Sequence, residues 1–71
     1  MPWAIIEADE RGQAIACYLR DSKLDADNRA IKSCEELGAT SRQAIERKLL
    51  KDGYVKCQGW TVSVTAVDDE N

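Results

Sequence analysis

The chain has 71 residues, of which 44% are hydrophobic and 32% are charged, and its formal net charge is −3. This length and composition predict one globular domain over residues 1–71 and exclude a disordered chain. No apolar stretch reaches the roughly 20 residues that a membrane-spanning helix requires, so we expect a cytoplasmic protein without membrane contact.

The residue types that carry catalysis and metal binding are scarce. The chain contains no histidine, which is the commonest general base and the commonest metal ligand. Its serines therefore lack an activating partner, and Glu35 and Glu36 are neighbours that would point in different directions on a helix. Three widely spaced cysteines, Cys17, Cys34 and Cys57, favour buried, inert thiols over a disulfide framework. We expect a protein that is not an enzyme and that requires no cofactor and no metal.

The first predicted elements are two strands joined by a short turn. Residues 3–8, WAIIEA, are apolar and led by an aromatic residue, which predicts a strand buried on both faces. The next four residues, DERG at 9–12, have the aspartate-first, glycine-fourth pattern typical of a type I turn. This pattern predicts a hairpin into a second strand over residues 13–19.

Residues 13–21 have a second interpretation. As a strand, this segment places three apolar side chains on one face, those of Ile15, Cys17 and Leu19. As a helix, it forms an apolar stripe from Ile15, Tyr18 and Leu19. We favour the strand, because Gly12 would weaken the first turn of a helix by up to about 1 kcal/mol.

A helix is predicted next, ending at Leu37. Asp25 or Asp27 would cap its beginning, and Gly38 follows its last residue as a helix-ending glycine. Its apolar residues recur at the spacing of one helix face. They are Ala30, Ile31, Cys34 and Leu37.

A second helix is predicted from Thr40 to about Lys51. The sequence TSRQ fits a capping box in which Gln43 reaches back to Thr40, and Asp52–Gly53 ends the helix. At about 100° per residue, Ile45, Leu49 and, more loosely, Leu50 group on the buried side of this helix. The opposite side carries Gln43, Ala44, Arg47, Lys48 and Lys51.

After Gly53 the apolar residues recur with a period of two. This change predicts strands in YVKCQ and WTVSVTAV, separated by a turn at Gly59. The second strand would turn Trp60, Val62, Val64 and Ala66 toward the core. If residues 60–67 lie at a sheet edge, their uncharged run predicts a homodimer through this strand; a protected interior strand is the alternative.

Together these elements predict a small α+β domain. An N-terminal strand or β-hairpin precedes two adjacent helices, and one or two C-terminal strands complete an antiparallel sheet. The predicted core consists of Ile5, Ile31, Cys34, Leu37, Ile45, Leu49, Trp60, Val62 and Val64.

Charge is distributed unevenly along the chain. The formal charges of residues 42–56 sum to +3, so the charges of the other residues sum to −6. Local field rather than net charge attracts a polyanion, and this segment therefore predicts a binding surface for nucleic acid or for an acidic protein. An ordinary solvated helix face is the more common explanation of such a segment. The candidate binding residues are Arg42, Gln43, Arg47, Lys48, Lys51 and Lys56.

Residues 30–64 carry a pattern of known type: a helix ending in Leu-Gly, a turn containing Ser-Arg, a second helix, then glycine and a hairpin. This pattern resembles the second half of the winged helix-turn-helix domain of bacterial GntR-type regulators. The resemblance implies a DNA-binding fold in which Ser41, Arg42 and Gln43 begin the recognition helix. It would place Lys56 and Gln58 on the wing.

Two functions follow from these observations. The first is a small, non-catalytic protein-interaction or inhibitor module of phage or mobile-element type, which occupies a macromolecular partner through charged surfaces. The alternative is a winged-helix transcriptional regulator that binds duplex DNA through the helix at about 41–51. We favour a protein partner, because the acidic remainder of the chain would repel the phosphate backbone.

Overall fold

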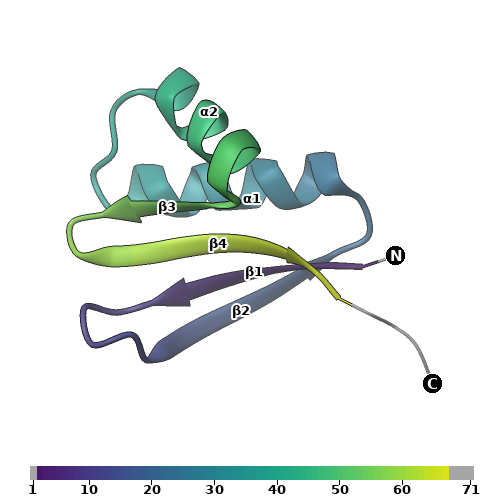
Figure 1. Ribbon diagram of the computed structural model, residues 1–71, viewed down its shortest axis with the longest axis horizontal. Coiled ribbons are helices and arrows are strands. Elements are labelled where there is room, and N and C mark those ends of the chain that lie inside the picture. The colour runs from purple at the N-terminus through teal and green to yellow at the C-terminus, as the bar shows by residue number, and fades with distance from the viewer. Residues whose placement is uncertain (1, 68–71) are drawn as a thin grey trace.

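Six elements follow one another in ββααββ order in the computed structural model, which describes residues 2–67 (Figure 1). They are β1 (Trp3–Ala8), β2 (Ala14–Arg20), α1 (Lys23–Glu36), α2 (Arg42–Asp52), β3 (Tyr54–Cys57) and β4 (Trp60–Ala66). The α+β prediction is confirmed, with both C-terminal strands present.

The four strands form one antiparallel sheet in the order β2-β1-β4-β3. β4 lies between β1, with which it pairs along its length, and β3, which covers it over Trp60–Ser63. The interior position is therefore the correct one of the two alternatives for this strand. Strand pairing with another copy along residues 60–67 would require an edge that β3 largely occupies.

The β1–β2 hairpin depends on the predicted turn. Gly12 donates its backbone N–H to the carbonyl of Asp9 over 2.9 Å. The Asp9 carboxylate accepts the N–H groups of Arg11 and Gln13 at 2.9 and 3.0 Å. Gly12 has φ of +80°, which glycine adopts without steric cost. The helical alternative for residues 13–21 is wrong, because this turn folds the segment back onto β1.

The first helix begins earlier than predicted. Ser22 caps it, accepting the N–H of Asp25 over 3.1 Å, so the predicted cap at Asp25 or Asp27 is wrong. Asp25 lies instead in the first turn, where its negative charge complements the helix dipole. Asp27 pairs with Lys23 at 2.9 Å. The predicted helix-ending glycine is confirmed, because Gly38 has φ of +100° just after the cap residue Leu37.

The second helix begins one residue later than predicted. Ser41, not Thr40, caps it and accepts the N–H of Ala44 over 3.3 Å. The helix ends as predicted at Asp52, and Gly53 follows with φ of +80°.

The β3–β4 turn also uses positive φ at Gln58 and Gly59, at +55° and +84°. This is the backbone pattern of the tight type I′ turns that match the twist of a hairpin.

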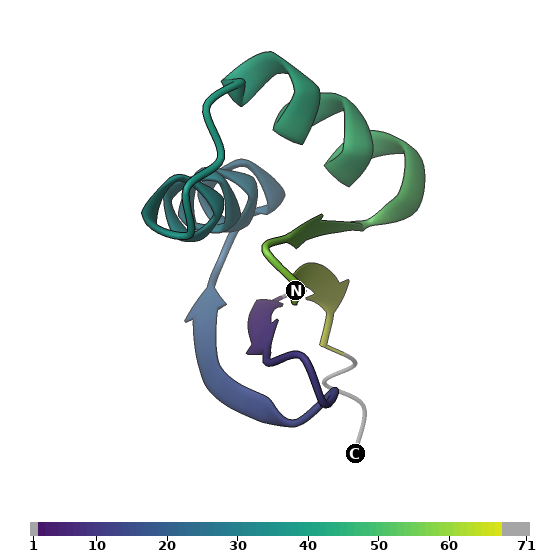
Figure 2. The ribbon, with the colours of Figure 1, turned by 90° about the vertical axis from the view of Figure 1, so that its left-hand side faces the viewer.

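Both helices cover the same face of the sheet (Figure 2). α1 packs across β1, β4 and β2, whereas α2 packs on β3 and against α1. The buried core lies between these layers. Its side chains include Ile5, Ala26, Ala30, Ile31, Cys34, Ile45, Leu49, Val55, Cys57, Val62 and Val64.

Most of the predicted core is confirmed, but two of its members are not fully buried. Leu37 packs at the margin of the core. Trp60 lies at the end of the sheet, where it lines a surface hollow with Asp9, Glu10 and Arg11 of the first turn. Ala66, predicted to face inward, is exposed at the end of β4.

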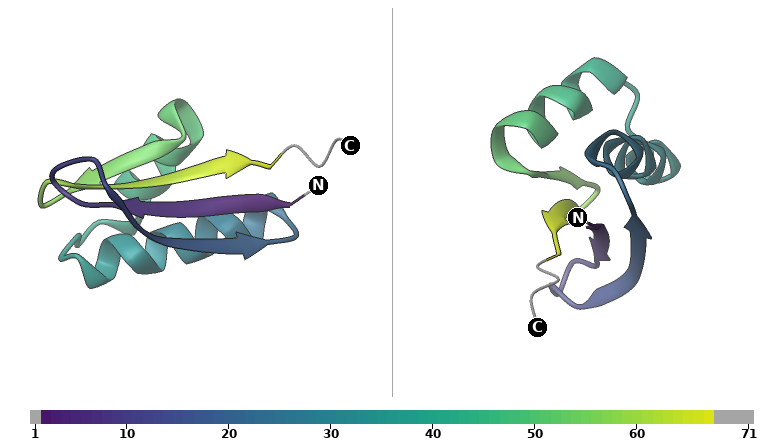
Figure 3. Two further views of the ribbon diagram at one scale, coloured as in Figure 1. Left: turned by 90° about the horizontal axis from the view of Figure 1, so that it is seen from below. Right: turned by 90° about the vertical axis from the view of Figure 1, so that its right-hand side faces the viewer.

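In the described part of the chain no helix lies over the other face of the sheet, as the view from below shows (Figure 3). Ile15, Cys17 and Leu19 share a face of β2, as predicted, but it is this uncovered face, and all three are exposed. The predicted burial of Cys17 is therefore wrong. β1 is buried on both faces only at Ala4 and Ile5. Its later residues are half-buried.

Candidate functional site

The basic residues of α2 point away from the core. Ile45 and Leu49 are buried one turn apart against the rest of the domain. The helical period therefore turns Arg47, Lys48 and Lys51 toward solvent, and all three are exposed. The predicted separation of a buried apolar side from an exposed basic side is confirmed for these residues.

Arg42 and Gln43 differ from the other candidates. Arg42 donates Nε to Glu46 Oε1, one turn along the helix, at 3.3 Å, and its Nη2 donates to Asn28 Oδ1 of α1 at 3.3 Å. Its charge is thus partly neutralised within the protein. Gln43 is exposed beside it and carries no charge.

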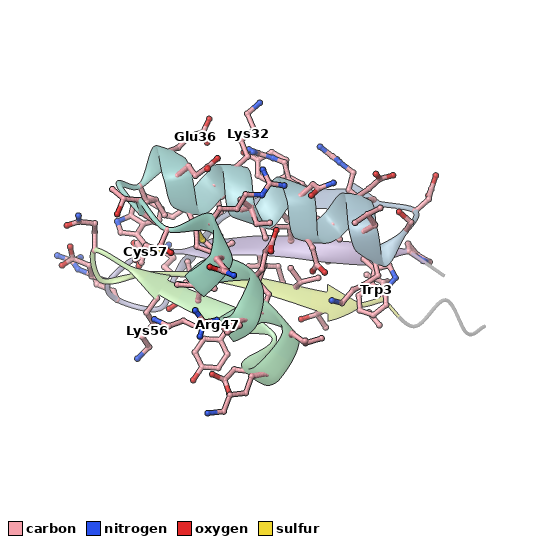
Figure 4. The ribbon with its side chains drawn as sticks, turned by 90° about the horizontal axis from the view of Figure 1, so that it is seen from above. Trp3, Lys32, Glu36, Arg47, Lys56 and Cys57 are labelled. Atoms are coloured by element: carbon pink, nitrogen blue, oxygen red, sulfur yellow. The ribbon has the colours of Figure 1, made fainter. Side chains whose placement is uncertain are left out.

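Lys56 joins the basic residues of α2 from the neighbouring strand. Figure 4 shows Arg47 and Lys56 on one side of the molecule, away from Lys32 and Glu36 of α1. Within residues 2–67, none of the four residues Arg47, Lys48, Lys51 and Lys56 forms an ion pair. We call these four residues the basic surface.

A pocket of about 200 Å³ lies beside the basic surface, between α2, β3 and the loop that joins the helices. Lys48 and Lys56 line it, together with the hydroxyl-bearing residues Thr40 and Ser41. The apolar side chains of Ile45 and Val55 form part of its wall. The pocket therefore combines positive charge, hydroxyl groups and apolar surface at one place.

Two large side chains that the sequence did not indicate as binding residues are exposed near the basic surface. Leu50, predicted loosely on the buried side of α2, is 84% exposed. Tyr54, the first residue of β3, is 43% exposed. Successive residues of a helix are about 100° apart, so the position of Leu50 directly after the buried Leu49 was the sequence signal for its exposure. Leucine and tyrosine beside basic residues offer the mixture of apolar and charged contacts that protein interfaces use.

The remaining two cysteines lie in the core. Cys34 of α1 and Cys57 of β3 are both buried and free, which confirms that part of the thiol prediction. Burial, followed by a hydrogen bond with the Cys57 thiol, raises the pKa of Cys34 from 9.0 to about 12. A thiol that stays protonated is a poor nucleophile and a poor metal ligand.

The described part of the chain contains no cluster of three or more His, Cys, Asp or Glu residues that could hold a metal ion. None of its helices is both long and apolar enough to cross a membrane.

The resemblance to winged-helix regulators can be compared with the observed topology. α1, α2 and the β3–β4 hairpin follow one another in the order that the resemblance implies. The segment that would supply the preceding helix, residues 13–21, contains strand β2. The fold is accordingly ββααββ, and the winged helix-turn-helix alternative for the whole chain is wrong. Comparison with protein-family models, with curated proteins and with solved structures finds no significant match to this chain.

Proposed function

We propose that this chain is a small protein-interaction module that binds an acidic surface of a macromolecular partner through its basic surface. The observation that carries the proposal is the grouping of Arg47, Lys48, Lys51 and Lys56 without an internal ion pair among the described residues. Unpaired charges of one sign on one side of a domain attract a partner of the opposite sign and orient it.

Exposed apolar side chains next to the charges support a protein partner. Leu50 and Tyr54 can supply the desolvated contacts that dominate the energy of most protein interfaces, while the lysines and arginine form a polar rim. The pocket beside Lys48 and Lys56 has room for a single side chain of the partner. Because two lysines are among its lining residues, we expect the pocket to receive an aspartate or a glutamate.

The test is photo-crosslinking in cells of the source organism. A photoreactive amino acid replaces Gln43, which is exposed on α2, and in a second strain it replaces Lys32 on the far side of the molecule. We expect a protein adduct from position 43 that is absent from position 32. The adduct should disappear in Arg47→Glu/Lys51→Glu.

The matched control is Arg11→Glu/Lys32→Glu, which makes the same change of net charge at exposed residues outside the basic surface. This variant should retain the adduct. Equal adducts from both positions, or an adduct that survives reversal of Arg47 and Lys51, would contradict the proposal.

A second candidate function is binding of duplex DNA. The observation that favours it is the presence of basic side chains on both α2 and the following hairpin, as the resemblance to winged-helix regulators implies for a recognition helix and wing. Labelled duplex DNA should then bind with an affinity that falls steeply with salt. Lys56→Gln should reduce the slope of log affinity against log salt by about 1. Absence of binding at low salt would exclude this function.

A further inference from the structure

Strand β2 forms one edge of the sheet, and among residues 2–67 it pairs with a neighbour only on its β1 side. An edge strand presents a row of N–H and C=O groups that can pair with a further strand. In β2 the carbonyl of Leu19 accepts Nη1 of Arg20 over 2.7 Å, so pairing at this carbonyl requires the Arg20 side chain to move away. The occupant that fits such an edge is an extended polypeptide segment.

The two faces of β2 have different surroundings. On the covered face, Tyr18 is half-buried, and the guanidinium of Arg29 lies over its ring at 4.0 Å. On the open face, Ile15 is 55% exposed, Leu19 is 61% exposed, and Cys17 is exposed between them. β2 therefore has an apolar row beside its free edge.

The two edges of the sheet are protected to different degrees. β3, at the other edge, has four residues and carries Lys56, and short length and lysine are both features that discourage pairing. β2 has seven residues, and its only charged side chain is Arg20 at its last position. The ladder with β1 is regular from Ala16 to Arg20 but skips Ile15, which is the extra residue of a β-bulge between Ala14 and Ala16. A bulge discourages edge pairing, so the beginning of β2 is better protected than its regular part.

We propose that a second copy of this chain occupies the β2 edge. The two β2 strands pair antiparallel about a two-fold axis at Cys17, and the two four-stranded sheets become one continuous sheet. In this register Cys17 lies opposite its own copy, and Ile15 of each chain lies opposite Leu19 of the other. A symmetric interface requires a self-complementary surface, and this apolar row has that property.

The positions of the charged side chains of β2 are compatible with this register. Arg20 of each copy lies opposite Ala14 of the other, so the two arginines stand at opposite ends of the paired strands. No like charges face each other within the ladder, and like charges directly opposite would be destabilising. The same register keeps open face next to open face, because residues directly opposite in an antiparallel pair point to the same side of the sheet.

The first test is the solution mass of the full chain, whose monomer is 7.9 kDa. Analytical ultracentrifugation at high micromolar concentration should give a dimer. Ile15→Lys and Leu19→Glu should each raise the dimer dissociation constant about tenfold, since each change disrupts two cross-strand pairs in the symmetric dimer. A monomeric wild-type protein would overturn the proposal.

Mixing the two variants tests the register itself. In a mixed dimer the lysine introduced at position 15 of one copy lies opposite the glutamate introduced at position 19 of the other. One Ile15–Leu19 pair stays intact, so mixing should restore dimerisation. The matched control, Leu50→Lys, places the same charge at an exposed leucine on α2 and should dimerise like wild type. Circular dichroism checks that each variant folds. Dimerisation that Ile15→Lys and Leu19→Glu leave unchanged would overturn the proposal.

Cys17 supplies an independent test. Diamide accepts two protons and two electrons from two thiols, which form one S–S bond as the reagent becomes the corresponding hydrazine. Because Cys34 and Cys57 are buried, the covalent dimer should form through Cys17 and should be absent in Cys17→Ser. The Cys17→Ser protein should still dimerise in ultracentrifugation. A covalent dimer that persists in Cys17→Ser would contradict the two-fold axis at this residue.

Discussion

The two faces of the sheet are built from the same alternating strands, yet only one of them is covered. On the covered face, Ile5 and Val62 are completely buried beneath the helices. On the open face, Ile15 and Leu19 remain more than half exposed. Apolar character therefore does not by itself place a side chain in the core. The surplus apolar side chains lie where another surface can still be added.

The largest expected difference between the faces concerns packing. Ile5→Ala should lower the free energy of unfolding by about 2–5 kcal/mol, because it leaves a cavity beneath the helices. Ile15→Ala, the same chemical change on the open face, should change the unfolding free energy of the monomer by less than about 0.5 kcal/mol. Urea unfolding at low protein concentration measures both values. Equal losses would mean that the open face is packed as tightly as the covered one.

The reactivity of the thiols should show the same difference between the open and the covered side of the sheet. Cys17 on the open face should react with a maleimide about 100-fold or more faster than Cys34 on the covered side. The buried thiol can react only when the structure opens, and the free energy of opening a core of this size is about 3–5 kcal/mol. Peptide mapping by mass spectrometry after timed labelling gives the two rates. Comparable rates in the folded protein would show that the helices do not seal the core.

The raised pKa of Cys34 predicts how the free energy of unfolding changes at high pH. Above pH 9 the unfolded chain releases the thiol proton, whereas the folded protein holds it until about pH 12. The unfolded state then binds fewer protons, so the free energy of unfolding falls as the pH rises from about 9 to about 12.

Lysines and tyrosines titrate in the same range, so the measurement compares wild type with Cys34→Ala. The variant lacks the thiol, and its stability should fall less steeply with pH. Parallel curves for the two proteins would contradict the raised pKa of Cys34.

The smallest expected effect concerns the helix that covers β3. Ser41→Ala should cost about 1 kcal/mol, because the N–H of Ala44 loses its capping partner. Thr40→Ala, one residue outside the helix, should alter the free energy of unfolding by less than about 0.5 kcal/mol. Thermal unfolding of the two variants distinguishes the caps. A larger loss of stability in Thr40→Ala than in Ser41→Ala would indicate that Thr40 caps the helix, as the sequence predicted.

Local patterns in the sequence predicted most of the fold. The first turn, both helix-ending glycines and the period-two strands depend on interactions within a few residues, and all of them are observed. The helix starts were displaced, by one residue at Ser41 and by three or more at Ser22. Serine, threonine and aspartate can all cap a helix, so neighbouring candidates of this kind compete and the backbone geometry selects one.

The candidate site was predicted less completely. The exposure of Arg47, Lys48 and Lys51 followed from the helical period, because Ile45 and Leu49 identify the buried side. The sequence carried a signal for the exposure of Leu50, which lies about 100° from Leu49, and for the ion pair of Arg42 with Glu46, which are four residues apart on one helix. The hydrogen bond from Arg42 to Asn28 of α1 is visible only in the structure. That contact depends on which neighbouring element comes close, and the period of a single helix does not contain that information.

The two helices, the turns and the outward direction of the basic residues could be predicted from the sequence, because they depend on backbone geometry and short-range spacing. The interior position of β4, the edge position of β2 and the direction of the apolar row of β2 are visible only in the folded domain. Strand order and the choice of covered face are set by contacts between residues far apart in the chain. Alternation along one strand is the same whichever of its two sides the helices cover.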